Sequence, residues 1–400
     1  MKPTKVIQIN SECGRGSTGK IAVSISKLLE QHGIENKVFY SGNHKSDYPN
    51  GVMISGKLSI RIHQLLSRIF GDQGFHSSFS TLRLIRKIKK MQPDVILLHN
   101  IHGYYINLSI LFKFLKRYGR PVYWVLHDCW SFTGHCTHFT IAGCDKWKTG
   151  CFACPQKDKY PYSWFFDRSR YLYKKKKELF TSLSDLTIIT PSQWLAEKVK
   201  DSFLGKYPIK VINNGIDLDV FKPTESDFRE KHGLCDKKII LGVASVWSYA
   251  KGLDVFVELA QRLDEDKYKI VLVGTDEKTD ASLPGNILSI HRTQNQKELA
   301  QIYSAADVFV NSTREENYPT VNMEAIACGT PVITFNTGGC AEIVGSGCGE
   351  IIRTDSADEA EQKITEQIQN NRQTTNDCLS WSTRFDDKRC FEEYVKLICR

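Results

Sequence analysis

The feature that most constrains the fold is the alternation of short apolar, β-branched runs with amphipathic helical segments. This pattern is typical of βαβ units, in which helices cover a parallel sheet, and it predicts an α/β fold. The expected strands are Val6–Asn10, Lys37–Tyr40, Asp94–His99, Pro121–Leu126 and Leu186–Thr190, then Lys210–Asn213, Lys238–Val243, Lys269–Val273, Asp307–Asn311 and Pro331–Thr334. Helices are expected at Leu253–Leu263, Gln296–Ser304 and Thr320–Cys328.

A change of charge along the chain indicates two domains. The 400 residues suit this number, and the net charge of +9 combines a basic first half with an acidic second half. A fresh strand follows Lys200–Pro208, so the predicted domains are residues 1–205 and 206–384, with residues 385–400 as a helix packing back towards the first. Both domains are expected to be doubly wound, Rossmann-like sheets whose strand-end loops face a shared cleft.

The N-terminal sequence and the cysteine content predict the cellular compartment of the protein. The N-terminus has no signal-peptide pattern, and no apolar run approaches the roughly 18 residues of a membrane span, so a cytoplasmic protein is expected. In that compartment the 13 cysteines are expected to be reduced, as buried apolar residues or metal ligands. The basic half is expected to meet an anionic partner, either a nucleic acid, a phosphorylated substrate or a membrane surface.

The first expected strand leads into a glycine-rich turn. Gly14, Gly19 and Lys20 have the spacing of a nucleotide-binding P-loop, but Ile21 stands where such a loop needs a hydroxyl for Mg²⁺. An ATPase or kinase is therefore disfavoured. The turn can still offer amides to a phosphate at the start of a helix. The alternative is a plain connection between strand and helix.

A carboxylate pair marks the second half. Glu316 and Glu324 stand eight residues apart, and both can enter one cleft if a loop carries Glu316 and a helix carries Glu324. The alternative is a pair of surface carboxylates on an acidic domain.

This segment resembles the donor site of retaining nucleotide-sugar glycosyltransferases, family 4 of the GT-B fold. Besides E-x7-E, the similar motifs are EAIACGTPV, GGCAEI, VINNGIDLDVFKP and KGLDVF, and the resemblance covers almost the whole chain. The stretch that begins HDCWSFTGHC resembles the colanic acid-type branch, which builds bacterial surface polysaccharides.

The resemblance assigns roles to individual residues. Glu316 is expected to hold the donor sugar, Glu324 the ribose and Lys251 the diphosphate. The loop after Glu316 is expected to bind sugar and phosphates through Asn317, Tyr318, Thr320 and Val321. His127 is expected at the catalytic centre, with His99 and His102 on the acceptor side. In relatives the loop after the first strand offers amides to the donor phosphates or the acceptor, so Gly16, Ser17 and Thr18 are the expected contacts there. The family's second diphosphate cation is replaced here by Val246, so Ser245 is expected to help instead.

The resemblance also implies a reaction. A hexose would pass from a UDP-, GDP- or dTDP-sugar to a polyprenyl-diphosphate-linked saccharide, with retention, in exopolysaccharide, capsule or O-antigen synthesis. For an enzyme of this family no catalytic metal is expected. The alternatives are a nucleotide-sugar epimerase or phosphorylase and, more remotely, a zinc-stabilised nucleic-acid-binding protein. The acidic half argues against the last, so no nucleic acid is expected as a partner.

A cysteine-rich insertion, residues 129–162, interrupts the first domain. Cys136, Cys144, Cys151 and Cys154 suit a structural zinc ion, which would order a loop of this length, and His135 or His138 could replace one thiol. A thiol-rich loop without metal and an iron–sulfur or redox site remain alternatives.

Two basic segments are candidates for membrane contact. Lys57–Phe70 places Leu58, Ile62, Leu65, Leu66 and Ile69 on one helical face, and Arg168–Phe180 joins a lysine run to aromatic residues. Such a helix either lies on an anionic membrane or packs its apolar face on its own domain. With the family resemblance, we expect peripheral binding to the cytoplasmic face of the bacterial inner membrane.

Overall fold

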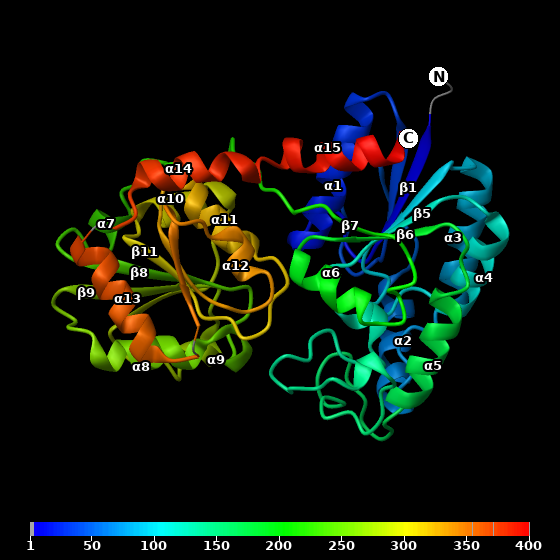
Figure 1. Cartoon of the computed structure of the whole chain (residues 1–400), viewed down its shortest axis with the longest axis horizontal. Coiled ribbons are helices and arrows are strands. Elements are labelled where there is room, and N and C mark those ends of the chain that lie inside the picture. Colours follow the sequence, from blue (N-terminus) through cyan, green and yellow to red (C-terminus); the bar gives the residue numbers. More distant parts are fainter. Residues whose placement is uncertain (1–3, 354, 371, 400) are drawn as a thin grey trace. The chain divides into compact units, whose positions relative to one another are not determined.

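The computed structural model describes residues 4–353, 355–370 and 372–399. The described chain forms two compact units, each considered by itself. The first unit contains residues 4–213 and 391–399, and the second unit is Asn214–Cys390. Each unit is built on a sheet of parallel strands with helices on its faces (Figure 1).

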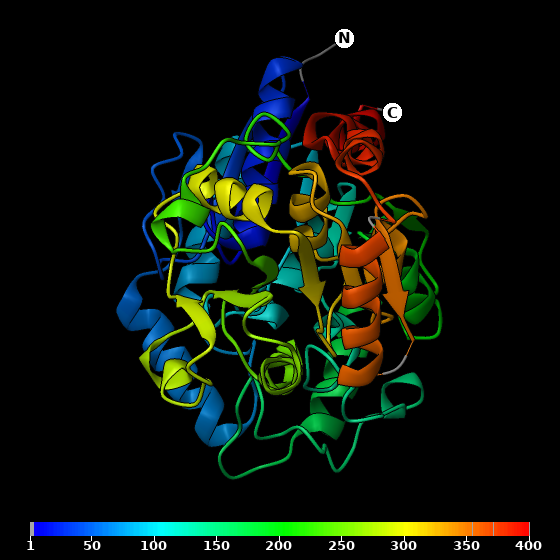
Figure 2. The same ribbon diagram turned by 90° about the vertical axis from the view of Figure 1, so that its left-hand side faces the viewer.

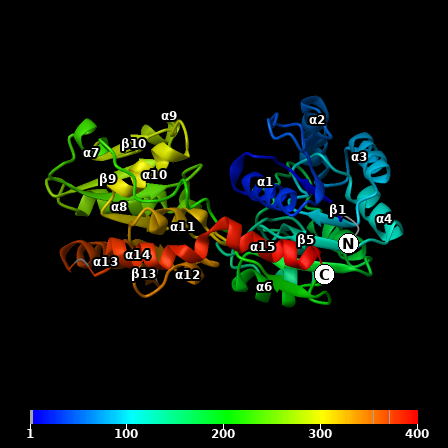
Figure 3. The same cartoon turned by 90° about the horizontal axis from the view of Figure 1, so that it is seen from above.

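Within its described ranges, the first unit has a sheet of seven strands in the order β3-β2-β1-β4-β5-β6-β7. The strands are β1 (Lys5–Asn10), β2 (Glu35–Tyr40), β3 (Gly51–Met53), β4 (Val95–Leu98), β5 (Val122–Val125), β6 (Leu186–Thr190) and β7 (Ile209–Val211). The helices are α1 (Gly16–Gln31), α2 (Lys57–Phe70), α3 (Ser78–Met91), α4 (Leu108–Tyr118), α5 (Ser169–Phe180) and α6 (Gln193–Lys200). Seen from above, α3 and α4 lie side by side (Figure 3).

The described residues of the second unit form six strands in the order β10-β9-β8-β11-β12-β13. They are β8 (Lys238–Val243), β9 (Tyr268–Val273), β10 (Ile287–Ile290), β11 (Val308–Asn311), β12 (Val332–Phe335) and β13 (Gly349–Ile352). The helices are α7 (Phe228–Lys231), α8 (Leu253–Arg262), α9 (Glu277–Asp280), α10 (Gln296–Ala305), α11 (Thr320–Ala327), α12 (Cys340–Ile343), α13 (Ala357–Asn370) and α14 (Thr375–Ser382). The last helix, α15 (Asp387–Ile398), begins in the second unit and continues into the first.

Both sheets have the doubly wound strand order that the sequence predicts. The chain builds outward from β1 in one direction, then returns to add β4 on its other side, and β8 and β11 repeat this arrangement. Ligands of such sheets bind beyond the carboxyl ends of the strands where the order reverses. The loops after β1 and β4, and after β8 and β11, are therefore the places to look for function.

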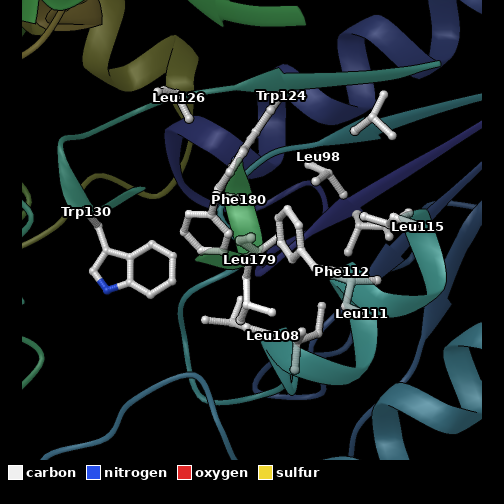
Figure 4. Close-up of a cluster of buried hydrophobic side chains, with 14 of the residues drawn as sticks. Leu98, Leu108, Leu111, Phe112, Leu115, Trp124, Leu126, Trp130, Leu179 and Phe180 are labelled. Carbon is white, nitrogen blue, oxygen red and sulfur yellow. The ribbon is translucent and has the colours of Figure 1, made fainter. Parts of the chain in front are cut away.

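Aromatic rings fill the core of the first unit (Figure 4). Phe180 lies against Phe112 with ring centroids 4.6 Å apart and meets Trp124 edge-on at 4.8 Å. This contact joins α5, α4 and β5, so the cysteine-rich insertion between β5 and α5 is fixed at both ends to the main core.

The core of the second unit has two sides. Phe256 of α8 and Ile364 of α13 belong to one buried cluster, and these two helices are neighbours in the side view (Figure 2). Tyr303 of α10 and Met323 of α11 belong to the other. Helices on both faces explain why the central strands are apolar throughout.

The structure moves the expected domain boundary. The sequence predicts that the strand at Lys210–Asn213 belongs to the second domain, but β7 pairs with β6 and the first unit extends to Asn213. The strands that the sequence did not reveal are β3, β10 and β13, and each is an edge strand of its sheet. Edge strands are half exposed, so they lack the apolar runs that identified the central ones.

The expected insertion has little regular structure. In the range 129–162, all of it described, the regular elements are the single 3₁₀ turns Trp130–Phe132 and Lys146–Lys148. Throughout the described residues, every helix is too short or too polar to cross a membrane.

Truncating Phe112 to alanine should lower the free energy of unfolding by about 3–5 kcal/mol, because a fully buried ring is lost and a cavity remains. Phe79 is 92% exposed, so Phe79→Ala should stay within about 0.5 kcal/mol of the wild type. Urea unfolding followed by tryptophan fluorescence measures both, since Trp124 lies in the same cluster. Equal midpoints for the two variants would contradict the packing described.

Candidate functional site

The first candidate site lies at the carboxyl ends of the strands of the first unit, and we call it the strand-end site. The loop between β1 and α1 forms one part of it. Gly14 and Gly16 have left-handed φ values of 71° and 63°, which turn the chain sharply from strand to helix. Gly16 and Ser17 are exposed, and α1 begins with neither a side-chain cap nor an acidic residue in its first turn. The first-turn amides and the positive end of the helix dipole therefore suit an anion.

Asn10 holds this loop in place. Its Nδ2 donates to the carbonyls of Glu12 (2.9 Å) and Thr18 (3.1 Å), and its Oδ1 accepts from the Asn100 amide (3.2 Å). One side chain thus connects the loops after β1 and β4. Lys20 is exposed and Ile21 is buried in the core, which agrees with the sequence argument against a P-loop.

Two histidines meet at the ends of β4 and β5. Nδ1 of His99 lies 3.1 Å from Nε2 of His127, and their rings stack with centroids 5.4 Å apart. Burial lowers the pKa of His127 to about 4 and that of His99 well below its usual value. Both imidazoles are therefore neutral at physiological pH.

A second polar group lies beside them. Nε2 of His102 is 2.9 Å from Oδ2 of Asp128, and its Nδ1 is 3.1 Å from the Tyr160 hydroxyl. Burial raises the pKa of Asp128, but His102 and the Trp130 amide outweigh it, and the pKa falls to about 2. His102 thus joins a carboxylate to a tyrosine that comes from the insertion.

The second unit brings Lys251 and Glu316 together. Lys251 ends the 3₁₀ turn Tyr249–Lys251 after β8, and Glu316 lies in the loop after β11. Lys251 Nζ lies 2.8 Å from Glu316 Oε2, with 35% and 24% of the side chains exposed. The cation and the carboxylate both remain accessible at this edge of the sheet. When a ligand binds, each side chain can replace its ion-pair partner with a charged or hydroxyl group of the ligand.

Arg314 fixes the two loops that carry this pair. It donates to the Tyr249 carbonyl (2.7 Å) and to both carboxylate oxygens of Asp254 (2.7 and 2.9 Å). It also bonds Asp355 at 2.6 Å. Because two carboxylates already neutralise it, Arg314 is a poor substitute for the missing diphosphate cation, and its role is structural.

The turn after β12 closes on the same loop. The Gly339 amide donates to the Asn317 carbonyl (2.8 Å). Gly338 has φ 58°, and a Cβ there would lie 1.9 Å from the Glu316 carbonyl oxygen. Only glycine allows this approach, which explains the first glycine of the GG motif.

The other expected donor residues differ in their burial and partners. Glu324 lies on α11 and accepts from the Tyr303 hydroxyl at 3.2 Å, and burial raises the pKa of Tyr303, which keeps that proton in place. Asn317 and Tyr318 are buried, whereas Thr320 and Val321 are partly exposed at the start of α11. Ser245 is exposed next to Val246, so its hydroxyl is accessible to a ligand.

The four thiols expected to hold zinc line one small cavity of about 20 Å³, together with His135. Nε2 of His135 is buried, and no hydrogen-bond partner for it lies among the described residues. However, no group of three or more His, Cys, Asp and Glu in the described part of the chain is arranged to hold a metal. The residue types fit zinc, the present spacing does not, and the site stays a prediction.

A buried lysine supports the insertion from α5. Lys176 Nζ donates to the carbonyls of Trp130 (2.9 Å) and Thr133 (3.2 Å) and lies 3.6 Å from the centre of the Trp130 ring. Burial lowers the pKa of Lys176 to about 7. This residue belongs to the lysine run that suggested a basic surface, so the run is only partly exposed.

Sequence reasoning missed several residues of these sites. Gln8 could have been noticed as a polar residue inside an apolar strand, and Asp128 as the neighbour of His127. Tyr160 and Arg314 carry no local signal, because their partners come from distant parts of the chain.

Comparison with protein families gives two matches that follow the two units. Residues 18–220 match the family Glycosyltransferase Family 4, and residues 224–381 match Glycosyl transferases group 1. The colanic acid biosynthesis glycosyl transferase WcaC of Escherichia coli is 27% identical over 363 residues, covering 87% of each chain. N,N'-diacetylbacillosaminyl-diphospho-undecaprenol alpha-1,3-N-acetylgalactosaminyltransferase of Campylobacter jejuni is 26% identical over 51% of this chain and 58% of its own.

Solved structures agree on the fold. Sucrose-phosphate synthase from Thermosynechococcus elongatus has a TM-score of 0.71 at 14% identity and covers 98% of both chains. HepE from Anabaena, solved with UDP-glucose, has a TM-score of 0.68 at 15% identity and covers 99% of both. Two doubly wound units, a family match over half of the sequence and a relative of similar length lead to one conclusion: the chain is a GT-B enzyme that belongs to glycosyltransferase family 4.

Proposed function

We propose that the enzyme transfers a hexose from a nucleotide sugar to a lipid-linked saccharide, with retention of configuration. The observation that most directly supports binding of the nucleotide-sugar donor is the accessible Lys251–Glu316 pair, which lies where the strand order of the second sheet reverses. Such a position binds nucleotides in doubly wound folds. In this scheme Lys251 neutralises the diphosphate as it leaves, where negative charge develops in the transition state.

The carboxylates take the hydroxyl groups of the donor. Glu316 would bind the sugar, and Glu324, oriented by Tyr303, would bind the ribose. Asn317, Tyr318, Thr320, Val321 and Ser245 would complete the pocket. In the first unit, Gly16 and Ser17 would offer amides to phosphate, and His127 would lie at the catalytic centre, with His99 and His102 on the acceptor side.

UDP is the nucleotide we propose first, because HepE was solved with UDP-glucose. GDP- and dTDP-sugars are the alternatives. For the acceptor, the name of the Campylobacter relative specifies a diphospho-undecaprenol saccharide, and that of the Escherichia coli relative specifies colanic acid biosynthesis. A polyprenyl-diphosphate acceptor also fits the basic half of the chain. We therefore place the reaction in surface polysaccharide synthesis at the cytoplasmic face of the inner membrane.

The surface of α2 supports membrane binding. The helix buries Ile60, His63 and Ser67, whereas Leu58, Ile62 and Leu65 are 73%, 50% and 49% exposed. The apolar face expected from the sequence is thus largely open rather than packed on its own domain. Exposed apolar residues on one face of a helix are typical of helices that lie in a membrane interface.

An aromatic segment continues this surface. Trp164, Phe165 and Phe166 are each at least half exposed, and the Trp164 amide donates to the Arg68 carbonyl near the end of α2. The Arg68 guanidinium lies 5.7 Å from the centre of the Trp164 ring. Leu58, Ile62, Leu65 and residues 164–166 form what we call the apolar patch. Exposed Arg61 and Arg83 close to it suit anionic headgroups.

We also propose that the cysteine cluster holds a structural zinc ion. The support is the shared cavity of Cys136, Cys144, Cys151 and Cys154 and the unpartnered nitrogen of His135 among the described residues. Binding would require the thiols to draw closer and lose their protons, whereas burial raises the pKa of Cys136 to about 12 and of Cys151 to about 11. Zinc itself supplies the charge that makes this ionisation favourable.

Donor binding is tested with Lys251→Ala. UDP-glucose should raise the melting temperature of the wild type, and this shift should shrink in the variant while transfer falls at least about 100-fold. The unliganded variant should melt close to the wild type, because partly exposed ion pairs add little stability. Lys267→Ala, which removes another lysine of the second unit paired with Asp264, should transfer normally. Stabilisation by ATP with Mg²⁺ and by no UDP-, GDP- or dTDP-sugar would refute the proposal.

Membrane binding is tested with Leu58→Ser/Ile62→Ser/Leu65→Ser. The triple variant should lose roughly tenfold or more of its partitioning to phosphatidylglycerol–phosphatidylcholine vesicles, measured by co-sedimentation, because apolar burial is lost. Salt should weaken wild-type binding further. Val246→Ser changes an exposed apolar residue of the second unit and should bind as the wild type does. Equal binding by all these proteins would exclude α2 as the docking helix.

The zinc proposal is tested by elemental analysis of purified protein. Wild type and Cys235→Ser, a change at an exposed cysteine of the second unit, should contain the same stoichiometric zinc. Cys151→Ser should lose the metal and melt at a lower temperature. Wild-type protein without zinc, melting unchanged by chelator, would favour a metal-free thiol loop.

A further inference from the structure

Gln8 is a polar residue in the middle of an apolar central strand. It lies on β1 between Ile7 and Ile9, and its side chain is fully buried. A buried amide must find partners for both its NH₂ group and its oxygen. Gln8 finds them in the Ala22 carbonyl, at 2.9 Å from its Nε2, and in His99, whose Nε2 lies 2.9 Å from its Oε1.

The partners of Gln8 fix the direction of each hydrogen bond. A carbonyl oxygen only accepts, so the NH₂ group must face Ala22 and the amide oxygen must face His99. That oxygen also only accepts, so Nε2 of His99 must carry a proton. A neutral imidazole has one N–H, which leaves a lone pair on Nδ1 of His99.

The direction of the hydrogen bond between His99 and His127 follows in the same way. Its Nε2 lies 3.1 Å from Nδ1 of His99, and since that atom accepts, Nε2 of His127 must donate. The proton of neutral His127 therefore sits on Nε2, and Nδ1 carries the lone pair. A substrate group that meets Nδ1 must be a donor, such as a sugar hydroxyl. The near-parallel stacking of the rings, at 12°, restricts the orientation of the imidazole as well.

We infer that Gln8 is a positioning residue for sugar transfer, which sets the tautomer and orientation of His127 through His99. The inference rests on the proposed function, in which His127 lies at the catalytic centre. If Gln8 had only a structural role, its amide group would form these hydrogen bonds without influencing the tautomer of His127.

Other charged groups near the relay define its pH response. Asp128 and His102 act on His127 from the end of β5 and the loop after β4, and His127 in turn acts on His99. Burial dominates and keeps both relay imidazoles neutral. A negative charge in place of the Gln8 amide would favour the protonated form of His99 and disturb this state.

The test uses the full-length enzyme labelled with ¹⁵N at histidine, without substrate. Long-range ¹H–¹⁵N spectra distinguish the two tautomers, and His127→Phe identifies the His127 signals by their loss. Wild-type His127 should have its proton on Nε2. In Gln8→Leu the signals should change to a mixture of tautomers, and kcat should fall about 10- to 100-fold, the range by which orienting partners support the groups they hold. The KM for the donor should change little.

Gln8→Glu supplies a second arm. It keeps an acceptor for His99 Nε2, so the Nε2–H tautomer of His127 should persist, but the pH below which transfer is lost should rise. Asn36→Leu removes a different buried amide, on β2, that bonds to Ser26 and Ile34. This control should lower the melting temperature without changing the tautomer or the pH profile.

Two results would overturn the inference. One is a wild-type His127 with its proton on Nδ1, and the other is a Gln8→Leu enzyme with the wild-type tautomer and pH profile. The NMR measurement needs no substrate, so failure of every nucleotide sugar to bind would refute the proposed function and still leave the tautomer result readable by itself.

Discussion

The reversal of strand order beside β1 and β8 is the constraint on which the sites depend. In a parallel sheet all carboxyl ends lie at one edge, and a reversal leaves the loops of two neighbouring strands free to diverge there. In the first unit these loops and the start of α1 carry Gly16, Ser17 and His99, and in the second unit the loops carry Lys251 and Glu316. Residues 65 positions apart in sequence thus meet as an ion pair because the topology places their loops together.

Much of this arrangement was readable from the sequence. The central strands were predicted because helices cover both of their faces and force long apolar runs, and the donor residues were predicted because family motifs follow those strands. The sequence does not predict the edge strands β3, β10 and β13, because exposed positions interrupt their apolar pattern. It places β7 in the wrong domain, because the pairing partner of a strand cannot be read from composition. Contacts between distant segments, such as His102 with Tyr160 or Arg314 with Asp254, depend on tertiary structure and leave no local trace.

Charge is handled differently in the two units. In the second unit Lys251 and Glu316 remain partly accessible. Arg314 is more buried, and its ion pairs with Asp254 and Asp355 hold the surrounding loops together. The first unit instead keeps its strand-end histidines neutral by burial and connects them in a relay that ends at Gln8. A site that binds an anionic donor and a site that handles hydroxyl groups would need these contrasting environments.

The insertion has a place in this scheme through Tyr160. Its hydroxyl meets His102, while Lys176 and Phe180 of the following helix attach the insertion to the core. The loop is therefore not a removable appendage but part of the wall of the strand-end site. For anyone recombining related enzymes, the unit to exchange is the insertion together with His102 and α5, since grafting the loop alone would separate Tyr160 from the histidine that its hydroxyl contacts.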